Sequence, residues 1–76
     1  MNSTQCKMAR AALGLGVRDL AALAGVSADT IARLERGEDL KASTLDGIRA
    51  ALEKRGVAFI AENGGGAGVR LKKRRK

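Results

Sequence analysis

Apolar residues recur at helical spacing over residues 17–36, where the pattern predicts two short helices. Leu20 and Ala24 lie four positions apart, so they share one face of the first helix. Ile31 and Leu34 lie three positions apart and share one face of the second helix. Polar residues occupy much of the opposite faces, and we therefore expect two amphipathic helices that pack on each other.

The residues between these two helices predict a tight turn. Gly25 lies where a chain that leaves a helix often needs a positive φ angle. Ser27 lies where its side-chain oxygen can cap the next helix, and Gly37 follows that helix and can end it. We therefore expect helices over about 17–24 and 28–36.

A further helical segment precedes this pair. Ser3 or Thr4 can cap a first helix of about 5–13. We expect Met8 and Ala12, to which Leu15 can add, to form its apolar stripe.

Another helical segment follows the pair, over about 44–55, with Ser43 as its expected cap. Gly47 lies inside this segment and costs a helix about 1 kcal/mol relative to Ala. The spacing of the apolar residues predicts one buried face, which completes the core. Its members are Leu45, Ile48 and Leu52.

The periodicity changes after Gly56, and residues 57–72 predict a β-hairpin around a glycine-rich turn. Two strands alone are marginally stable in water, so this hairpin must pack on the helices or pair with another chain. Its free edge favours strand addition across a homodimer. The predicted dimer contacts are Val57, Phe59, Val69 and Leu71.

Charge is unevenly distributed along the 76 residues, whose net charge is +7. Residues 70–76 hold six of the fifteen basic residues and none of the eight acidic ones. The length and pattern predict one domain over residues 1–72, followed by a disordered basic tail over 73–76. Such a tail favours a polyanionic partner, of which nucleic acid is the commonest.

Several function classes fit the composition poorly. The chain has no His, and Cys6 is its single cysteine, so it can form neither an internal disulfide nor a multi-cysteine metal site. Paired catalytic carboxylates and a P-loop are missing as well, and we expect neither an enzyme nor a cofactor. No apolar run approaches the ~20 residues of a membrane span, and no signal-peptide pattern opens the chain, which favours a cytoplasmic, nucleoid-associated protein.

The segment AGVSADTIARLERG, residues 24–37, resembles the helix-turn-helix of the Cro/cI-like (XRE) family of regulators. The resemblance implies a mainly α fold, with a four-helix domain and a C-terminal hairpin, and a recognition helix over about 28–36. Glu35 matches an acidic position of the family, and we interpret it as structural. The matching positions are Leu20, Ala21, Ala24, Gly25, Val26, Ser27, Thr30, Ile31, Leu34, Glu35, Arg36 and Gly37.

The face of the second helix opposite Ile31 and Leu34 is the expected reader of DNA bases. Arg33 can pair with guanine O6 and N7, and Asp29 can accept from a cytosine amino group. An ion pair between Asp29 and Arg33, four positions apart, is the alternative. The predicted base contacts are Ala28, Asp29, Thr30, Ala32 and Arg33.

Phosphate contacts are expected around this helix. The first residues of helix 17–24, Val17 and Arg18, can offer backbone N–H groups and a positive charge. Relatives usually have Ser or Thr and then Gln where this chain has Gly16 and Val17. Asp19 can help cap the first turn, but we interpret it as an acid favoured by the helix dipole. The other predicted phosphate contacts are Ser27, Arg36, Lys41, Ser43, Lys72, Lys73, Arg74 and Arg75.

The resemblance implies a sequence-specific transcriptional regulator, most simply a repressor of a mobile element, that binds an inverted repeat of double-stranded DNA as a homodimer. One alternative is an interaction protein, such as an antitoxin, whose hairpin and tail serve a protein partner (a toxin or an antiactivator). Another is a low-specificity DNA-binding accessory factor of recombination.

Overall fold

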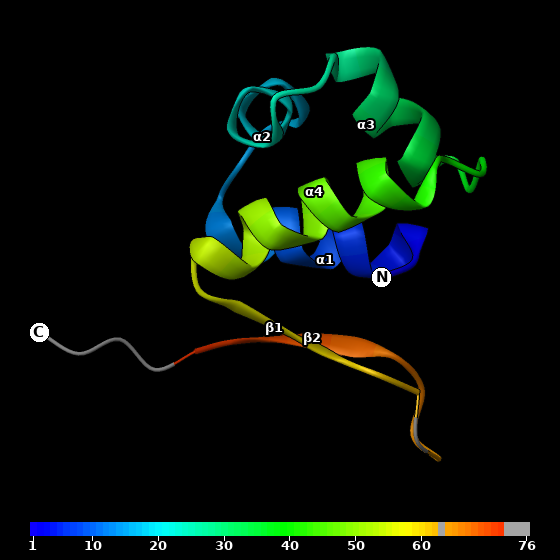
Figure 1. The fold of residues 1–76 in the computed structure, drawn as a ribbon. Helices are drawn as coiled ribbons and strands as arrows, with labels where there is room; N and C mark the ends of the chain where they lie inside the picture. The colour runs from blue at the N-terminus through cyan, green and yellow to red at the C-terminus, as the bar shows by residue number, and fades with distance from the viewer. Residues whose placement is uncertain (63, 73–76) are drawn as a thin grey trace, which may run out of the picture.

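The computed structural model describes residues 1–62 and 64–72 of the chain. Four helices precede a two-stranded antiparallel hairpin, which confirms the predicted fold class. The hairpin lies against α1 and α4, whereas α2 and α3 lie on the other side of the helical layer (Figure 1). The elements are α1 (Ser3–Leu13), α2 (Val17–Ala24), α3 (Ala28–Glu35), α4 (Ala42–Lys54), β1 (Val57–Ile60) and β2 (Gly68–Leu71).

The core is aliphatic, and every helix and β1 contribute to it. Leu20 and Ile31 meet at its centre with no exposed surface, as the helical spacing predicts. Ala21 is also buried, and a small side chain at this position lets α2 and α3 approach closely. The remaining buried apolar residues are Cys6, Ala9, Leu34, Ile48, Leu52 and Val57.

The turn between α2 and α3 has the predicted geometry. Gly25 has a φ angle of 70°, and the N–H of Val26 donates to the carbonyl of Ala21 at 3.0 Å. An L side chain rarely adopts this backbone conformation, which is why a glycine ends α2. The Ser27 Oγ atom accepts from the backbone N–H of Thr30 at 3.1 Å, so the expected cap of α3 is confirmed.

The expectations for α1 are wrong in two respects. The helix begins at Ser3, and its cap is Asn2, whose side chain accepts from the N–H of Gln5. Its buried face consists of Cys6 and Ala9, with Gln5 beside them. Met8 is only half-buried and Ala12 is exposed.

The expected start of the fourth helix is also wrong, because α4 begins at Ala42. Ser43 lies inside the helix, and its N-cap is Lys41, which makes no side-chain capping bond. The predicted core residues of α4 remain correct, since Ile48 and Leu52 are fully buried and Leu45 packs against the core. The shifted start leaves the first N–H groups of α4 without a side-chain cap.

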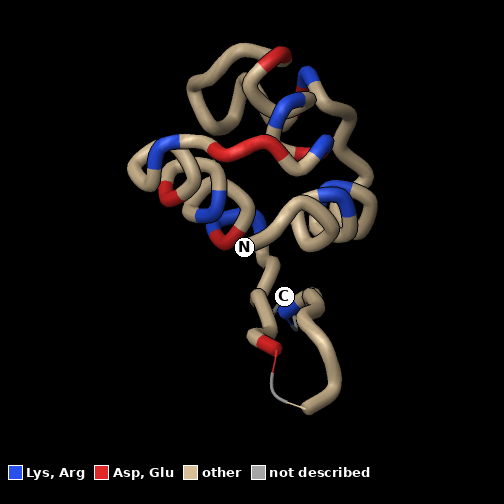
Figure 2. The backbone as a smooth tube through the Cα atoms, turned by 90° about the vertical axis from the view of Figure 1, so that its right-hand side faces the viewer, with Lys and Arg blue, Asp and Glu red and all other residues tan. Residues whose placement is uncertain are grey.

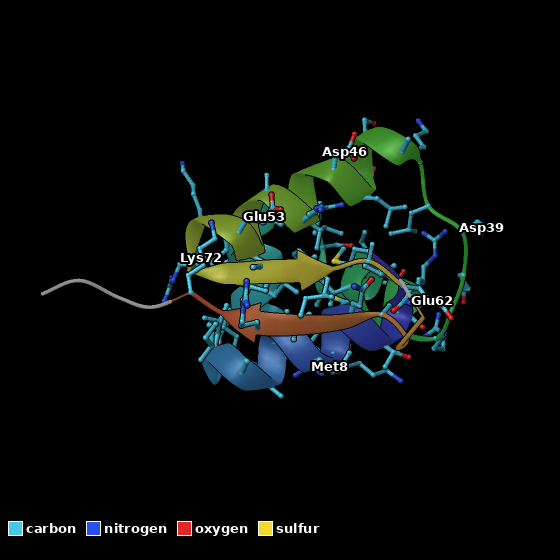
Figure 3. All side chains as sticks on the ribbon, turned by 90° about the horizontal axis from the view of Figure 1, so that it is seen from below. Met8, Asp39, Asp46, Glu53, Glu62 and Lys72 are labelled. Carbon is cyan, nitrogen blue, oxygen red and sulfur yellow. The ribbon has the colours of Figure 1, made fainter. Side chains whose placement is uncertain are left out.

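The hairpin has the predicted antiparallel pairing, with Val57 opposite Leu71 and Phe59 opposite Val69. The buried Gln5 side chain connects it to α1, because its Nε2 donates to the carbonyls of Ile60, at 3.0 Å, and Gly68, at 2.9 Å. The hairpin covers the helices in Figure 3, with Glu62 at one end and Lys72 at the other. Packing on the helices therefore supports two strands that would be marginally stable alone.

Candidate nucleic-acid interface

Helix α3 lies on the side of the molecule away from the hairpin (Figure 1). Ile31 and Leu34 are buried on the inner side, as expected. Asp29 lies on the outer side, and the side chains of Arg33 and Arg36 are 42% and 58% exposed. The helix thus presents one acidic and two basic side chains on a single accessible face.

The two arginines on this face share one carboxylate. Arg33 Nε donates to Glu38 Oε1 at 3.1 Å, and Arg36 donates to Glu38 Oε2 from Nε at 3.1 Å and from Nη2 at 2.9 Å. The alternative ion pair between Asp29 and Arg33 is not formed, since Arg33 pairs with Glu38 instead. Asp29 therefore keeps its carboxylate available on the outer face of α3.

The backbone after α3 determines where Glu38 lies. Gly37 has a φ angle of 91°, and the N–H of Glu38 donates to the carbonyl of Arg33 at 3.0 Å. This closing bond turns the chain back along the last turn of α3. The hydrogen bonds from Arg36 and then Arg33 lower the pKa of the Glu38 carboxyl group, so it is ionised at neutral pH.

A groove of about 450 Å³ runs beside the N-terminal half of α3. Arg33 lies on one wall, and Lys41 and Thr44 from the start of α4 lie on the other. Asp39 also lines it, from the loop between α3 and α4 (Figure 3). The groove thus has basic and hydroxyl groups on both walls and a single carboxylate between them.

The start of α3 contributes hydroxyl groups to this groove. Ser27 and Thr30 both line it, and their hydroxyl oxygens are 2.9 Å apart. When Thr30 is the donor, the Ser27 hydroxyl proton is free for an acceptor outside the chain. A phosphate oxygen is such an acceptor.

The start of α2 differs from the expectation in one detail. The Asp19 carboxylate accepts from the N–H of Gly16 at 2.8 Å, so Asp19 acts as a cap rather than only as an acid favoured by the dipole. Val17 packs partly against the core, and Arg18 is exposed. Any phosphate at this helix end would therefore lie close to both the Arg18 charge and the Asp19 carboxylate.

The remaining predicted phosphate contacts are separated in space. Lys41 and Ser43 are exposed at the start of α4, near α3. Lys72 is also exposed, but it lies at the end of the hairpin, on the side of the molecule away from α3 (Figure 3). Lys73, Arg74 and Arg75 lie outside the described residues.

A second ion pair, on the inner side of the molecule, attaches α3 to α1. Arg10 donates from Nε and Nη2 to the two carboxylate oxygens of Glu35, both at 2.9 Å. The Cys6 thiol donates to the same carboxylate at 3.4 Å, and Arg10 Nη1 donates to the carbonyl of Leu15 at 3.2 Å. This cluster confirms that Glu35 is structural and fixes the C-terminal end of α3 relative to α1.

The cluster also shifts the pKa values of its members. The hydrogen bond from Arg10 holds the pKa of Glu35 below its ordinary value. Burial and the neighbouring Glu35 raise the pKa of the Cys6 thiol to about 12, so the thiolate does not form at physiological pH. Cys6 is therefore a packing residue.

The hairpin residues predicted to contact a second chain differ widely in exposure. Val57 has no exposed surface, because it is part of the chain's own core, and we remove it from the predicted interface. Phe59 and Val69 are half-buried against the helices, and Leu71 is 50% exposed. The alternation of the strand did not identify Ile60, which is 42% exposed.

Charges of both signs are interspersed over the helices (Figure 2). Along residues 1–62 and 64–72 neither sign of charge predominates in this view, which agrees with the nearly balanced charge of the sequence before residue 70. Within the same residues no group of three acidic, His or Cys side chains is placed to hold a metal ion. None of the helices described is long and apolar enough to cross a membrane.

Comparison with known proteins agrees with this geometry. A family model described as a helix-turn-helix domain matches residues 4–53, which include all four helices except the first residue of α1 and the last residue of α4. The chain belongs to this family, as a Cro/cI-like, XRE-type helix-turn-helix domain. A search of curated proteins found no match. The family indicates DNA binding.

Proposed function

We propose that the protein is a sequence-specific transcriptional regulator that binds an inverted-repeat operator as a homodimer and represses by occluding a promoter. The observation that carries this proposal is the outer face of α3. It presents Asp29 and Arg33 beside a groove whose other wall holds Lys41 and Thr44. In a major groove, Arg33 would donate to guanine, Asp29 would accept from a cytosine amino group, and the opposite wall would meet the phosphates.

The remaining base contacts are smaller. Ala28 and Ala32 are half-buried at the edges of the outer face, where their methyl groups can touch a thymine methyl. Thr30 shares its hydroxyl with Ser27 and adds a polar contact to either a base or the backbone. Discrimination between DNA sequences would therefore depend mainly on Arg33 and Asp29.

A dimer suits the dimensions of the chain. The two recognition helices of such a dimer must lie about one turn of DNA (~34 Å) apart, and the two longer dimensions of the 33 × 31 × 19 Å chain are comparable with that spacing. The exposed Leu71 and Ile60 side chains on the hairpin supply apolar surface for the second chain. The same surface favours a second candidate function, in which the hairpin holds a protein partner such as a toxin while α3 binds DNA.

The test is binding to a duplex from the region upstream of the protein's own gene, compared with random DNA of equal length, across a salt series. The intact protein is expected to prefer its own region by ~10³ or more, with two chains per duplex. Arg33→Ala should lose most of that preference, because it removes the main base-edge donor of α3. Deletion of residues 72–76 should flatten the salt dependence and leave the preference intact, because a basic tail neutralises phosphates without reading bases.

Equal binding of both duplexes by the intact protein would refute the regulator and support an accessory factor of low specificity. One chain per duplex, with the preference retained, would refute the homodimer alone. Co-purification of a stoichiometric small protein from the native source would support the second candidate.

A further inference from the structure

We infer that Glu38 is a specificity-determining residue: it orients Arg33 toward base edges and withholds Arg36 from phosphates. This inference rests on the proposed function and concerns how α3 discriminates between DNA sequences. Glu38 lies three residues after the end of α3, outside the predicted reading helix. Its carboxylate nevertheless contacts both arginines on the exposed face of that helix.

The backbone conformation after α3 places Glu38 beside the two arginines. The positive φ angle of Gly37 and the bond from the Glu38 N–H to the Arg33 carbonyl place the Cα of Glu38 beside the last turn of α3. From there each carboxylate oxygen accepts from a different arginine. A carboxylate held in this way is directed at the two arginines before any DNA arrives.

Arg33 is held only by its Nε atom, which donates to Glu38 at 3.1 Å. Within the described residues its terminal Nη1 and Nη2 atoms make no hydrogen bond, so both remain available to guanine O6 and N7. A guanidinium fixed on one edge has fewer orientations to lose when the other edge binds a base. Glu38 therefore positions Arg33 as a reader without competing for its reading atoms.

Arg36 is held differently, because its Nε and Nη2 atoms both donate to the Glu38 carboxylate. Its charge is compensated locally, and the edge that would grip a phosphate is already occupied. A phosphate contact by Arg36 would strengthen binding to every DNA sequence equally. By occupying Arg36, Glu38 suppresses sequence-independent binding relative to specific binding.

The test compares Glu38→Gln with a matched control, Glu62→Gln, which makes the same charge change on the hairpin, away from α3. Glu62 is exposed and makes no ion pair with any residue that the structure describes. Two probes are used: a random-sequence duplex, and the duplex that the intact protein selects from a randomised library. Affinities are measured for both across a salt series, and thermal unfolding of each variant verifies that it folds.

Glu38→Gln is expected to bind the random duplex about tenfold more tightly at 0.1 M salt. The released Arg36 would make one additional phosphate contact, which adds about 0.9 to the slope of log affinity against log salt concentration. Binding to the selected duplex should stay about unchanged, because the lost orientation of Arg33 offsets the new phosphate contact, so the ratio of the two affinities should fall about tenfold. Glu62→Gln should leave the salt slope unchanged and the ratio within about threefold of that of the intact protein. Adding Arg36→Ala to Glu38→Gln should restore the salt slope, which identifies the residue that was released.

Equal effects of Glu38→Gln and Glu62→Gln on the affinity ratio would overturn the inference, because net charge alone would then explain the change. An unchanged ratio in Glu38→Gln would overturn it as well. A failure of the proposed function looks different, because the intact protein would then select no sequence from the library at all. Exposed ion pairs contribute little to stability, so all these variants should unfold within a few degrees of the intact protein.

Discussion

Replacing Glu35 by Gln removes a charge at the contact between α3 and α1 while keeping the shape of the side chain. In the native protein both carboxylate oxygens accept from Arg10 at 2.9 Å, and the Cys6 thiol donates to one of them. The side chains of Glu35 and Arg10 are only 10% and 23% exposed. The substitution therefore leaves a largely buried guanidinium facing an amide that can accept only through its oxygen.

The expected cost follows from this burial. Removing one partner of a fully buried ion pair costs about 3–5 kcal/mol, and the partial exposure of Arg10 reduces this to about 2–3 kcal/mol. A domain of this size has a total stability of roughly 4–11 kcal/mol, so the loss is a large fraction. The thermal midpoint should fall by about 10–20 °C.

The chain offers a matched control for this change in Glu53→Gln. Glu53 pairs with Arg49 at 3.1 Å within α4, but their side chains are 41% and 45% exposed. An exposed pair of this kind is worth about 0.3–0.5 kcal/mol, so the midpoint should fall by less than about 4 °C. Because the chain has no Trp or Tyr, unfolding is followed by circular dichroism at 222 nm, in urea and on heating. The reasoning is refuted if the two variants lose the same stability.

Three further predictions test other parts of the structure. The pKa of Glu35 is lowered in the folded state, so the stability that its ion pair contributes is present above about pH 4.5 and is lost as the pH falls through the folded-state pKa. Urea midpoints between pH 3 and 7 should therefore fall at acidic pH, and Glu35→Gln should lose part of that slope; an unchanged slope contradicts the assignment. Cys6 should not react with a disulfide reagent at pH 8 in the native protein, because it is buried and its pKa is about 12; its reaction should follow the urea unfolding curve, and a rapid native reaction would count against the burial. Gly47→Ala should stabilise the protein by up to about 1 kcal/mol, since Gly47 is exposed in α4 and an added Cβ meets nothing within 4 Å. A lower thermal midpoint in that variant would show that Gly47 has a contact role that its surroundings do not suggest.

The sequence alone identified the helix-turn-helix because its signals are local. The turn requires a residue with a positive φ angle at Gly25 and a hydroxyl cap at Ser27, and each depends on neighbours within four positions. The buried faces of α2 and α3 follow from helical spacing, and so does the exposure of Arg33. Local geometry of this kind is encoded residue by residue, so it can be read without the rest of the fold.

The buried face of α1 could not be predicted from helical periodicity alone. Small or apolar residues occur on several sides of the helix, among them Cys6, Met8, Ala9 and Ala12, so periodicity alone could not choose the inner face. Packing against α3 and β2 decides it, and buries Cys6 and Ala9. The same packing buries Gln5, whose acceptors at Ile60 and Gly68 lie 55 and 63 positions away.

The electrostatics of the candidate interface also depended on tertiary structure. Glu35 reaches Arg10 across 25 positions, a distance at which the sequence contains no signal of contact. Glu38 reaches Arg33 only because the chain reverses at Gly37, although helical spacing favours a pair between Arg33 and Asp29. The sequence by itself therefore determined which face of α3 is exposed to solvent and which side chains that face carries. The folded chain decided how those charges are paired, because pairing depends on distances that only the closed turn and the packed helices establish.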